Sequence, residues 1–224
     1  MIWITGDKHG QIEAFEEDSR YKKIKKRDTL IVCGDFGFVW DGSKQEMKNL
    51  KWLDKRKYTI AFVDGCHENF DLLSHYPIVD FCGGKARELA DNIYQLMRGE
   101  LYEIDGKKVL SFGGGISDNH DEDLLGISWW KAEAPTDKEI SNAIESLKKA
   151  EGEVDLIVSY EPPLSIKPCM EEMLQDSGTI HEVLEQIRTH CSFKMWYFGK
   201  YHVDKHIPPS YAAVFEKLLK YAGD

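Results

Sequence analysis

The first nine residues, "MIWITGDKH" (1–9), join a short apolar run to an aspartate and a histidine that stand two positions apart. A short run of apolar and β-branched residues is typical of a buried strand. Residues two positions apart on extended backbone point the same way, so Asp7 and His9 can aim at one point. The N-terminus therefore predicts a strand that ends in two convergent polar side chains.

The same arrangement recurs along the chain. The further runs that we expect to be buried strands are "TLIVC" (29–33), "YTIAFV" (58–63), "KVLSF" (108–112), "DLIVS" (155–159) and "MWYF" (195–198). Asp35 follows the first of these runs, His67 the second, and Lys200 with His202 the last. Ligands of open α/β sheets bind beyond the carboxyl ends of the strands. The sequence therefore predicts that these side chains meet in one crevice.

Helical patterns lie between the expected strands. Apolar residues recur on one face of 44–56 (Met47, Leu50, Leu53) and of 136–150 (Ile140, Ala143, Ile144, Leu147). Thr136 with Glu139 forms a capping box at the start of the second helix. The alternation of strands and helices predicts an α/β architecture. The close spacing of strands in 93–113 and 203–214 predicts antiparallel pairing there.

The composition limits the class of protein. A chain of 224 residues that is 42% hydrophobic fits a single globular domain over residues 1–224. The five cysteines are odd in number and form no C-x-x-C pair, which favours free thiols. The chain has no apolar run long enough to span a membrane and no signal-peptide pattern, so we expect a cytoplasmic protein without a membrane partner.

The formal net charge of −10 bears on possible partners. A negative protein repels a phosphate backbone, so we expect no long nucleic acid partner unless a local basic patch overrides the total charge. A small phosphorylated molecule remains compatible with the charge, because a pocket can be locally positive.

The polar groups at the strand ends also suggest a metal. A single aspartate after a strand is more often a turn former or a helix cap. Two carboxylates and two or three imidazoles in one crevice are instead ligands for a divalent transition metal such as Mn, Fe or Zn. The recurrence at successive strand ends therefore favours a metal or phosphate site.

Five motifs carry a family resemblance. In order they read "DKH" (7–9), "GD" (34–35), "GCHE" (65–68), "SYEPP" (159–163) and "GKYH" (199–202). The chain resembles the calcineurin-like metallophosphoesterase family, whose pattern is D-x-H, G-D, G-N-H-[DE], a lone His and G-H-x-H. The resemblance implies a four-layer fold, in which two packed mixed β-sheets are flanked by helices, and a two-metal site that hydrolyses phosphate esters.

The resemblance divides the site into two halves. The implied ligands of the first metal are Asp7, His9, Asp35 and His202, and all four are present. The positions private to the second metal hold Cys66, Tyr160 and Lys200. A lysine ammonium has no lone pair and places a positive charge where a second cation would lie. We therefore expect at most one divalent metal, or none, with Lys200 able to neutralise Asp35 and to bind phosphate with Tyr160 and Cys66.

Three further residues receive roles from the resemblance or from their position. His67 matches the family's histidine beside the scissile phosphate, where it would stabilise charge or protonate the leaving group, and Glu68 would orient it. Lys8 lies inside the first motif, where it would either add positive charge beside the pocket or stay solvated. The remaining histidines, His75, His120, His181, His190 and His206, have no ligand spacing, and we treat them as structural or surface groups.

Three functions remain open. We favour a protein that binds or sequesters a phosphorylated small molecule, such as a nucleotide, with little or no hydrolysis. The first alternative is a one-metal phosphoesterase that uses Lys200 as an electrostatic substitute for the second metal. The second alternative is a non-catalytic scaffold for protein partners. The sequence leaves open the ligand's identity, the oligomeric state and whether the substitutions are natural or engineered.

Overall fold

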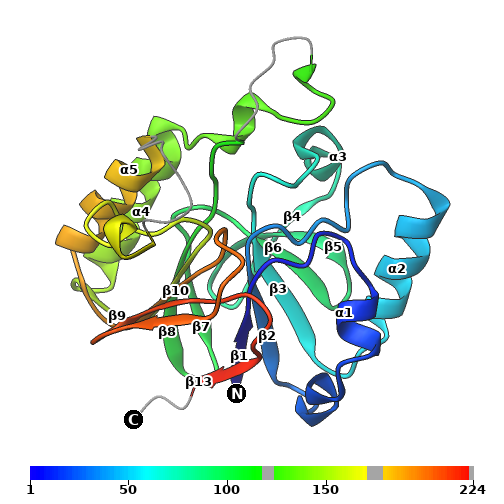
Figure 1. Cartoon of the computed structure of the whole chain (residues 1–224). Helices are drawn as coiled ribbons and strands as arrows, with labels where there is room; N and C mark the ends of the chain where they lie inside the picture. The colour runs from blue at the N-terminus through cyan, green and yellow to red at the C-terminus, as the bar shows by residue number, and fades with distance from the viewer. Residues whose placement is uncertain (118–123, 171–178, 222–224) are drawn as a thin grey trace.

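The computed structural model describes residues 1–117, 124–170 and 179–221 (Figure 1). Within these residues one sheet has seven strands. Their order is β13 (Leu219–Tyr221), β1 (Ile2–Thr5), β2 (Thr29–Cys33), β3 (Thr59–Val63), β6 (Ile93–Leu96), β5 (Gly84–Ala90) and β4 (Ile78–Phe81). Strands β1, β2, β3 and β6 are parallel. Strand β13 pairs antiparallel with β1, and β5 pairs antiparallel with both β6 and β4.

The second sheet has six strands in the described part of the chain. Their order is β11 (Lys205–Ile207), β12 (Tyr211–Ala213), β10 (Ser192–Phe198), β9 (Glu153–Ser159), β8 (Lys107–Phe112) and β7 (Leu101–Ile104). The inner strands are parallel, whereas β7 with β8 and β11 with β12 are antiparallel pairs. These two pairs confirm the antiparallel pairing expected near 93–113 and 203–214.

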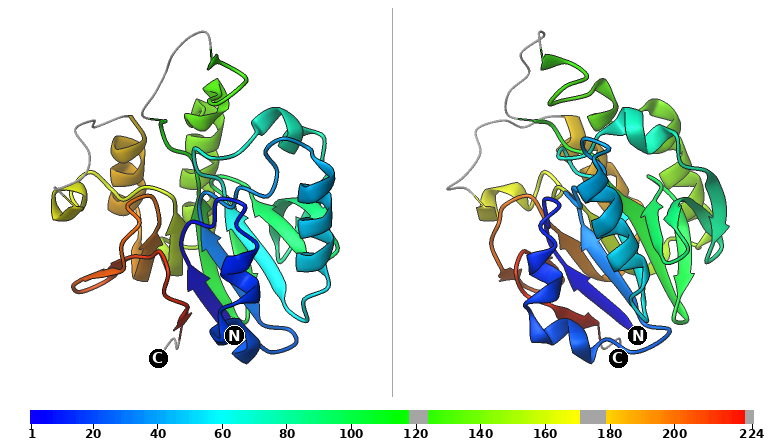
Figure 2. Two further views of the ribbon diagram at one scale, coloured as in Figure 1. Left: turned by 45° about the vertical axis from the view of Figure 1, so that its right-hand side comes forward. Right: turned by 90° about the vertical axis from the view of Figure 1, so that its right-hand side faces the viewer.

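The two sheets pack face to face between helices (Figure 2). The first layer holds α1 (Glu13–Glu16), α2 (Lys44–Asp54) and α3 (Phe70–Ser74), and the last layer holds α4 (Asp137–Lys149) and α5 (Thr179–Thr189). Short 3-10 helices are η1 (Ser19–Lys23), η3 (Lys131–Glu133) and η4 (Lys167–Met170). The four layers confirm the expected fold.

Strand periodicity explains this layering. In β2, Leu30 and Val32 face the cluster under α2, whereas Ile31 faces the second sheet. Side chains of a strand alternate between its faces, so a strand that is apolar throughout must be covered on both sides. Both faces of the central strands are therefore buried, and the polar groups concentrate in the loops at the strand ends.

The expected helices form with small differences. Thr136 and Glu139 make the predicted capping box of α4, and Ser43 caps α2 by accepting a hydrogen bond from the Glu46 N–H. The expected apolar face of 44–56 was wrong at Met47, which is 53% exposed, because the sheet is covered by Leu50 and Leu53. No helix in the described ranges is long and apolar enough to cross a membrane.

Candidate metal and phosphate site

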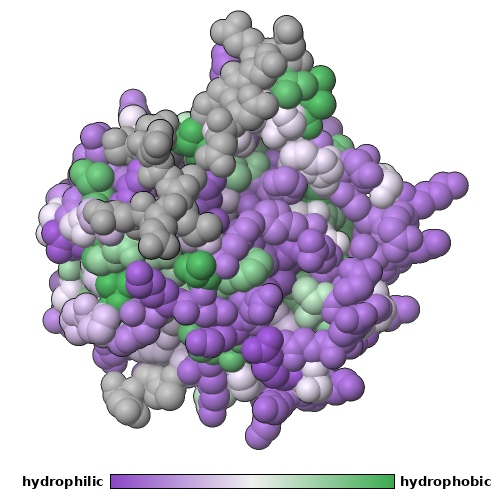
Figure 3. Space-filling view, viewed as in Figure 1, coloured by the Kyte–Doolittle hydropathy of each residue, from purple (hydrophilic) through white to green (hydrophobic). Residues whose placement is uncertain are grey.

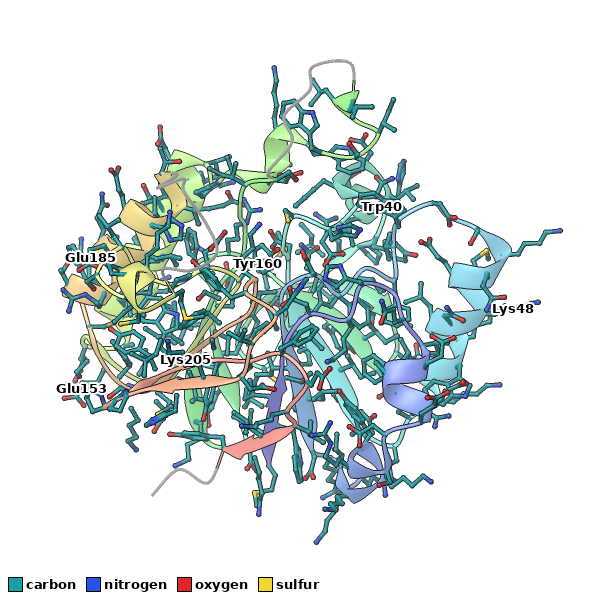
Figure 4. The ribbon with its side chains drawn as sticks, in the orientation of Figure 1. Trp40, Lys48, Glu153, Tyr160, Glu185 and Lys205 are labelled. Atoms are coloured by element: carbon teal, nitrogen blue, oxygen red, sulfur yellow. The ribbon has the colours of Figure 1, made fainter. Side chains whose placement is uncertain are left out.

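The candidate site lies at the carboxyl ends of β1, β2, β3, β9 and β10, where loops from both sheets meet. Figure 4 shows Tyr160, which directly follows β9, near the centre of the molecule, while Glu153 at the start of the same strand lies at its edge. His9, Asp35, Lys200 and His202 all adopt positive φ, between 43° and 69°. Non-glycine residues rarely adopt this backbone, and such strain gathers at functional sites.

Two glycines make the close approach of these loops possible. Gly34 has a φ of 96°, and a side chain there would collide with the ring of Tyr160. A side chain at Gly199 would collide with the Asp7 carboxylate and the Cys33 carbonyl. Glycine therefore lets the loops after β2 and β10 close onto the site.

Asp7, His9 and His202 form a compact group that could hold a metal. The Nε2 atoms of the two histidines lie 3.0 Å apart, and His202 Nε2 lies 3.1 Å from Asp7 Oδ2. That oxygen is buried and has no hydrogen-bond partner among the described residues. An unsatisfied buried carboxylate oxygen that faces two imidazoles is suited to a cation.

Asp35 and His67 join the same cluster through His9. The His9 Nε2 lies 3.8 Å from Asp35 Oδ2, and His9, Asp35 and His67 form a second group with ligand spacing. Burial, and after it the Asp7 carboxylate, raise the pKa of Asp35 to about 7. Burial lowers the pKa values of His9 and His67, whereas the adjacent Asp7 carboxylate raises the pKa of His202. Neutral imidazoles at His9 and His67 keep lone pairs available for a metal.

Cys66, Tyr160 and Lys200 lie together beside Asp35. The Tyr160 hydroxyl donates to Asp35 Oδ2 at 2.8 Å and lies 3.1 Å from Cys66 Sγ, and Lys200 Nζ lies 3.6 Å from the same sulfur. Burial, and next the Asp35 charge, raise the pKa of the Cys66 thiol to about 12. Burial also raises the pKa of Tyr160 above its ordinary value. The Cys66 thiol and the Tyr160 phenol therefore keep their protons at neutral pH, and in this form they are poor metal ligands.

One carboxylate close to the Lys200 ammonium was missed by sequence reasoning. We expected Lys200 to neutralise Asp35, and its charge does lower the pKa of that group. Lys200 Nζ also lies 4.0 Å from Glu161 Oε1, and the Lys200 main-chain N–H donates to Asp7 Oδ1. Glu161 is 3% exposed, and burial raises its pKa to about 7. A glutamate directly after Tyr160 in "SYEPP" was the available signal, because a buried ammonium needs a nearby anion.

His67 and Glu68 occupy different surroundings, although they are adjacent in the chain. The His67 ring stacks on Trp40, with centroids 4.7 Å apart, and its centroid lies 4.9 Å from that of His9. Glu68 accepts hydrogen bonds from the main-chain N–H groups of Phe36 and Gly37 instead of orienting the His67 ring. Glu68 therefore holds the loop that carries Asp35, and Trp40 is the group that fixes the His67 ring.

Lys8 is not solvated, contrary to one of the two expectations. The residue is 5% exposed, and its Nζ donates to the Phe215 carbonyl at 3.1 Å. Burial lowers the pKa of Lys8 to about 8. The Phe215 ring in turn stacks on His202, with centroids 4.8 Å apart. Lys8 thus holds the segment around Phe215 in place, and the Phe215 ring supports His202.

Of the remaining histidines, His181 is buried, with its Nδ1 at 2.8 Å from the Pro162 carbonyl, and His120 lies outside the described residues.

A family model for calcineurin-like phosphoesterases matches residues 1–205. The chain belongs to this family. A search of curated proteins returned no match. Phosphoesterases of this family use divalent metals, and the matched region includes every residue of the cluster around Asp7 and Asp35.

The two halves of this phosphoesterase site fit a metal to different degrees. Asp7, His9, Asp35 and His202 supply carboxylate and imidazole donors, and one buried carboxylate oxygen among them lacks a hydrogen bond. The other half offers a phenol, a thiol and an ammonium, of which the phenol already donates to Asp35. The donor chemistry of the first half therefore fits a metal better than that of the second half does.

Proposed function

We propose that the protein binds a phosphorylated small molecule, of the nucleotide class, at a one-metal site and hydrolyses it slowly or not at all. The observation that carries this proposal is the hydrogen bond from Tyr160 to Asp35, with Cys66 and Lys200 closing around it. These groups occupy the space beside Asp35 and supply hydrogen-bond donors and one positive charge.

Charge and donors favour an anion in this site. The side chain of Lys200 is 8% exposed, so its ammonium acts in a medium where electrostatic attraction is stronger than in water. Ammonium, phenol and imidazole groups are suitable donors for phosphate oxygens. A metal held by Asp7, His9, Asp35 and His202 would add Lewis acidity to the same face of the phosphate.

Aromatic residues favour a ligand with a base. Trp40 is half-buried beside His67, and its ring meets that of Trp130 edge to face with centroids 5.5 Å apart. Aromatic rings at the rim of a phosphate site are suited to stacking against a nucleobase.

Slow turnover follows from the missing second cation. In two-metal sites the metals stabilise both the attacking and the leaving oxygens, and each 1.4 kcal/mol of lost stabilisation slows the reaction about tenfold. An ammonium that is already close to Glu161, the main-chain carbonyl of Ile116 and Cys66 replaces the charge but not the Lewis acidity.

A one-metal phosphoesterase is the second candidate. It is favoured by His67, whose imidazole lies beside His9 and whose pKa is lowered by burial, so that it is free to accept a proton. In this alternative Lys200 would stabilise charge in the transition state as well as in the ground state.

Three measurements on the full chain test the proposal. We expect one equivalent of Mn²⁺ by elemental analysis, a rise in melting temperature with 5′-AMP, and hydrolysis of a p-nitrophenyl phosphodiester close to background. Lys200→Gln should abolish the metal-dependent part of the AMP effect. Two metal equivalents would overturn the one-metal site, fast turnover would select the second candidate, and no thermal response to phosphorylated ligands would favour a protein-binding scaffold.

A further inference from the structure

A cavity of about 350 Å³ lies where α1 and η1 meet the C-terminal end of α2. Small-molecule sites usually have volumes of roughly 300–1,000 Å³. The segment 55–58 lines this cavity and leads into the amino end of β3, whereas His67 follows the carboxyl end of that strand. The cavity is therefore at the opposite end of the sheet from the candidate metal site.

Aromatic side chains form the walls of this cavity. They are Phe15, Tyr21, Trp52 and Tyr58. Phe15, Tyr21 and Tyr58 are 4–5% exposed, and the rings of Phe15 and Tyr21 lie 5.0 Å apart. The Tyr58 hydroxyl has no hydrogen-bond partner within the described ranges. The walls thus combine ring surface with the hydroxyl of Tyr58.

Cations line the same cavity. Lys22, Lys55 and Lys57 are exposed, and the guanidinium of Arg56 lies 3.6 Å from the centroid of the Trp52 ring. Glu16 is the single acidic residue among those that line the cavity. The Arg56 Nε also donates to the Trp52 carbonyl, which fixes the guanidinium over the indole.

Two basic loops surround the cavity. The segments "KKIKKR" (22–27) and "KRK" (55–57) are brought close by a main-chain hydrogen bond just after them, from the Thr59 N–H to the Asp28 carbonyl. Figure 3 shows hydrophilic residues over much of the side of the molecule that carries α1 and α2 in Figure 1. In a chain of net charge −10, so many lysines and arginines in two adjacent loops form a local site for anions.

We propose that this cavity is a second ligand site, for a small anion that carries a flat ring and has about the size of a nucleoside monophosphate. The ring packs against Trp52 and Tyr58, and the anionic group lies among Lys22, Lys55 and Lys57. Single-stranded nucleic acid is less suited, because successive bases need exposed rings and three of the four aromatic side chains here are nearly buried. The inference is independent of the proposed function, because it involves none of the metal-site residues.

Calorimetric titration of the full chain in EDTA tests this site without the metal. We expect 5′-AMP to bind at one site. Its affinity should be at least about tenfold higher than that of ribose 5-phosphate or inorganic phosphate, because these two lack the flat aromatic base. Equal affinity for AMP and ribose 5-phosphate, or no binding of AMP, would overturn the proposal. Tighter binding of an oligothymidylate, with a steep salt dependence, would show a nucleic-acid surface instead.

Matched variants locate the binding. The double variant Lys55→Glu/Lys57→Glu should weaken AMP binding at least about tenfold, whereas Lys148→Glu/Lys149→Glu, the same charge change on exposed residues of α4, should leave it unchanged. Trp52→Ala should weaken binding and Trp52→Phe should largely retain it. In a Lys200→Gln background, which lacks the cation of the metal-site half, the Lys55→Glu/Lys57→Glu change should still weaken AMP binding to the same degree. An AMP affinity that responds to Lys200→Gln and ignores the α2 variants would place the ligand in the metal site and overturn this inference.

Discussion

The two halves of the candidate site differ in how well their polar groups are satisfied. On one side, Asp7 Oδ2 is buried without a hydrogen bond, and the Nε2 atoms of His9 and His202 face each other at 3.0 Å. On the other side, Tyr160 donates to Asp35, and Lys200 lies near Glu161. The first half offers a cation an unsatisfied carboxylate oxygen, whereas the second half already contains the Lys200 ammonium. A cation supplied by a side chain can balance buried carboxylates, as a bound metal would.

The largest expected effect comes from giving the second half of the site side chains that can bind a metal, as the first half has. The triple variant Cys66→Asn, Tyr160→His and Lys200→His should bind a second metal equivalent and raise phosphodiester hydrolysis with Mn²⁺ by about a thousandfold or more. Each single reversion should do little, because a ligand set acts as a unit.

The matched control keeps the cation in place. A triple variant with Lys200→Arg in place of Lys200→His carries the same changes at the other two positions and should stay slow. A wild-type rate equal to that of the histidine variant would show that Lys200 already replaces the metal catalytically. Metal analysis and initial rates check both variants.

The second effect concerns pH and Glu161. Burial raises its pKa from 4.5 to about 7 in the folded state, so between these pH values the native protein holds a proton that the unfolded chain has lost. The resulting stabilisation is complete below pH 4.5 and is lost as pH rises through 7. From pH 4.5 to 8 the wild type should therefore lose about 3 kcal/mol of unfolding free energy relative to Glu161→Gln, which has no carboxyl group to titrate at this position.

Urea denaturation across this pH range measures the difference. Glu182→Gln changes an exposed glutamate of α5 and should give a difference that hardly varies with pH. A flat difference for Glu161→Gln would mean that Lys200 keeps Glu161 ionised in the folded protein.

The third effect tests the need of the first half for a cation. Asp7→Asn should abolish the stabilisation that Mn²⁺ gives to the wild type, which is about 2.7 kcal/mol at a hundred times the dissociation constant. In EDTA the variant should be at least as stable as wild type, because it removes a buried negative charge, one oxygen of which (Oδ2) has no hydrogen bond among the described residues.

Thermal denaturation with Mn²⁺ and with EDTA checks both statements. Asp91→Asn, at an exposed carboxylate, is the control that should respond to the metal as wild type does. A full metal response in Asp7→Asn would exclude Asp7 from the ligands.

The smallest effect concerns the aromatic rim. Trp40→Ala removes the ring that stacks on His67 and should cost about 1 kcal/mol of folding free energy and weaken nucleotide binding several-fold. Trp40→Phe keeps a ring and should restore most of both. If ribose 5-phosphate and AMP lose affinity equally in Trp40→Ala, the ring does not contact the base.

The sequence predicted the strands and the convergence of polar side chains beyond their ends, because both depend on local patterns. Apolar runs of strand length and polar residues directly after them can be read along the chain. The contacts of Glu68 and Lys8 were not predicted. Their partners, the main chain at 36–37 and the Phe215 carbonyl, are distant in sequence. The cavity beside Trp52 was also missed, since it is formed by α1, η1 and the end of α2 together.

The sequence by itself determined an α/β architecture and the residue types at each strand end, because strand periodicity is a property of the chain, and the order of its motifs carried the family resemblance that implied four layers. Only the tertiary structure decided which of these groups satisfy one another. Glu161 is adjacent to Tyr160 in the chain, yet it lies beside Lys200 because β9 and β10 are neighbouring parallel strands whose ends meet. Distances between side chains on different strands set the charge balance of the site, and these distances follow from packing.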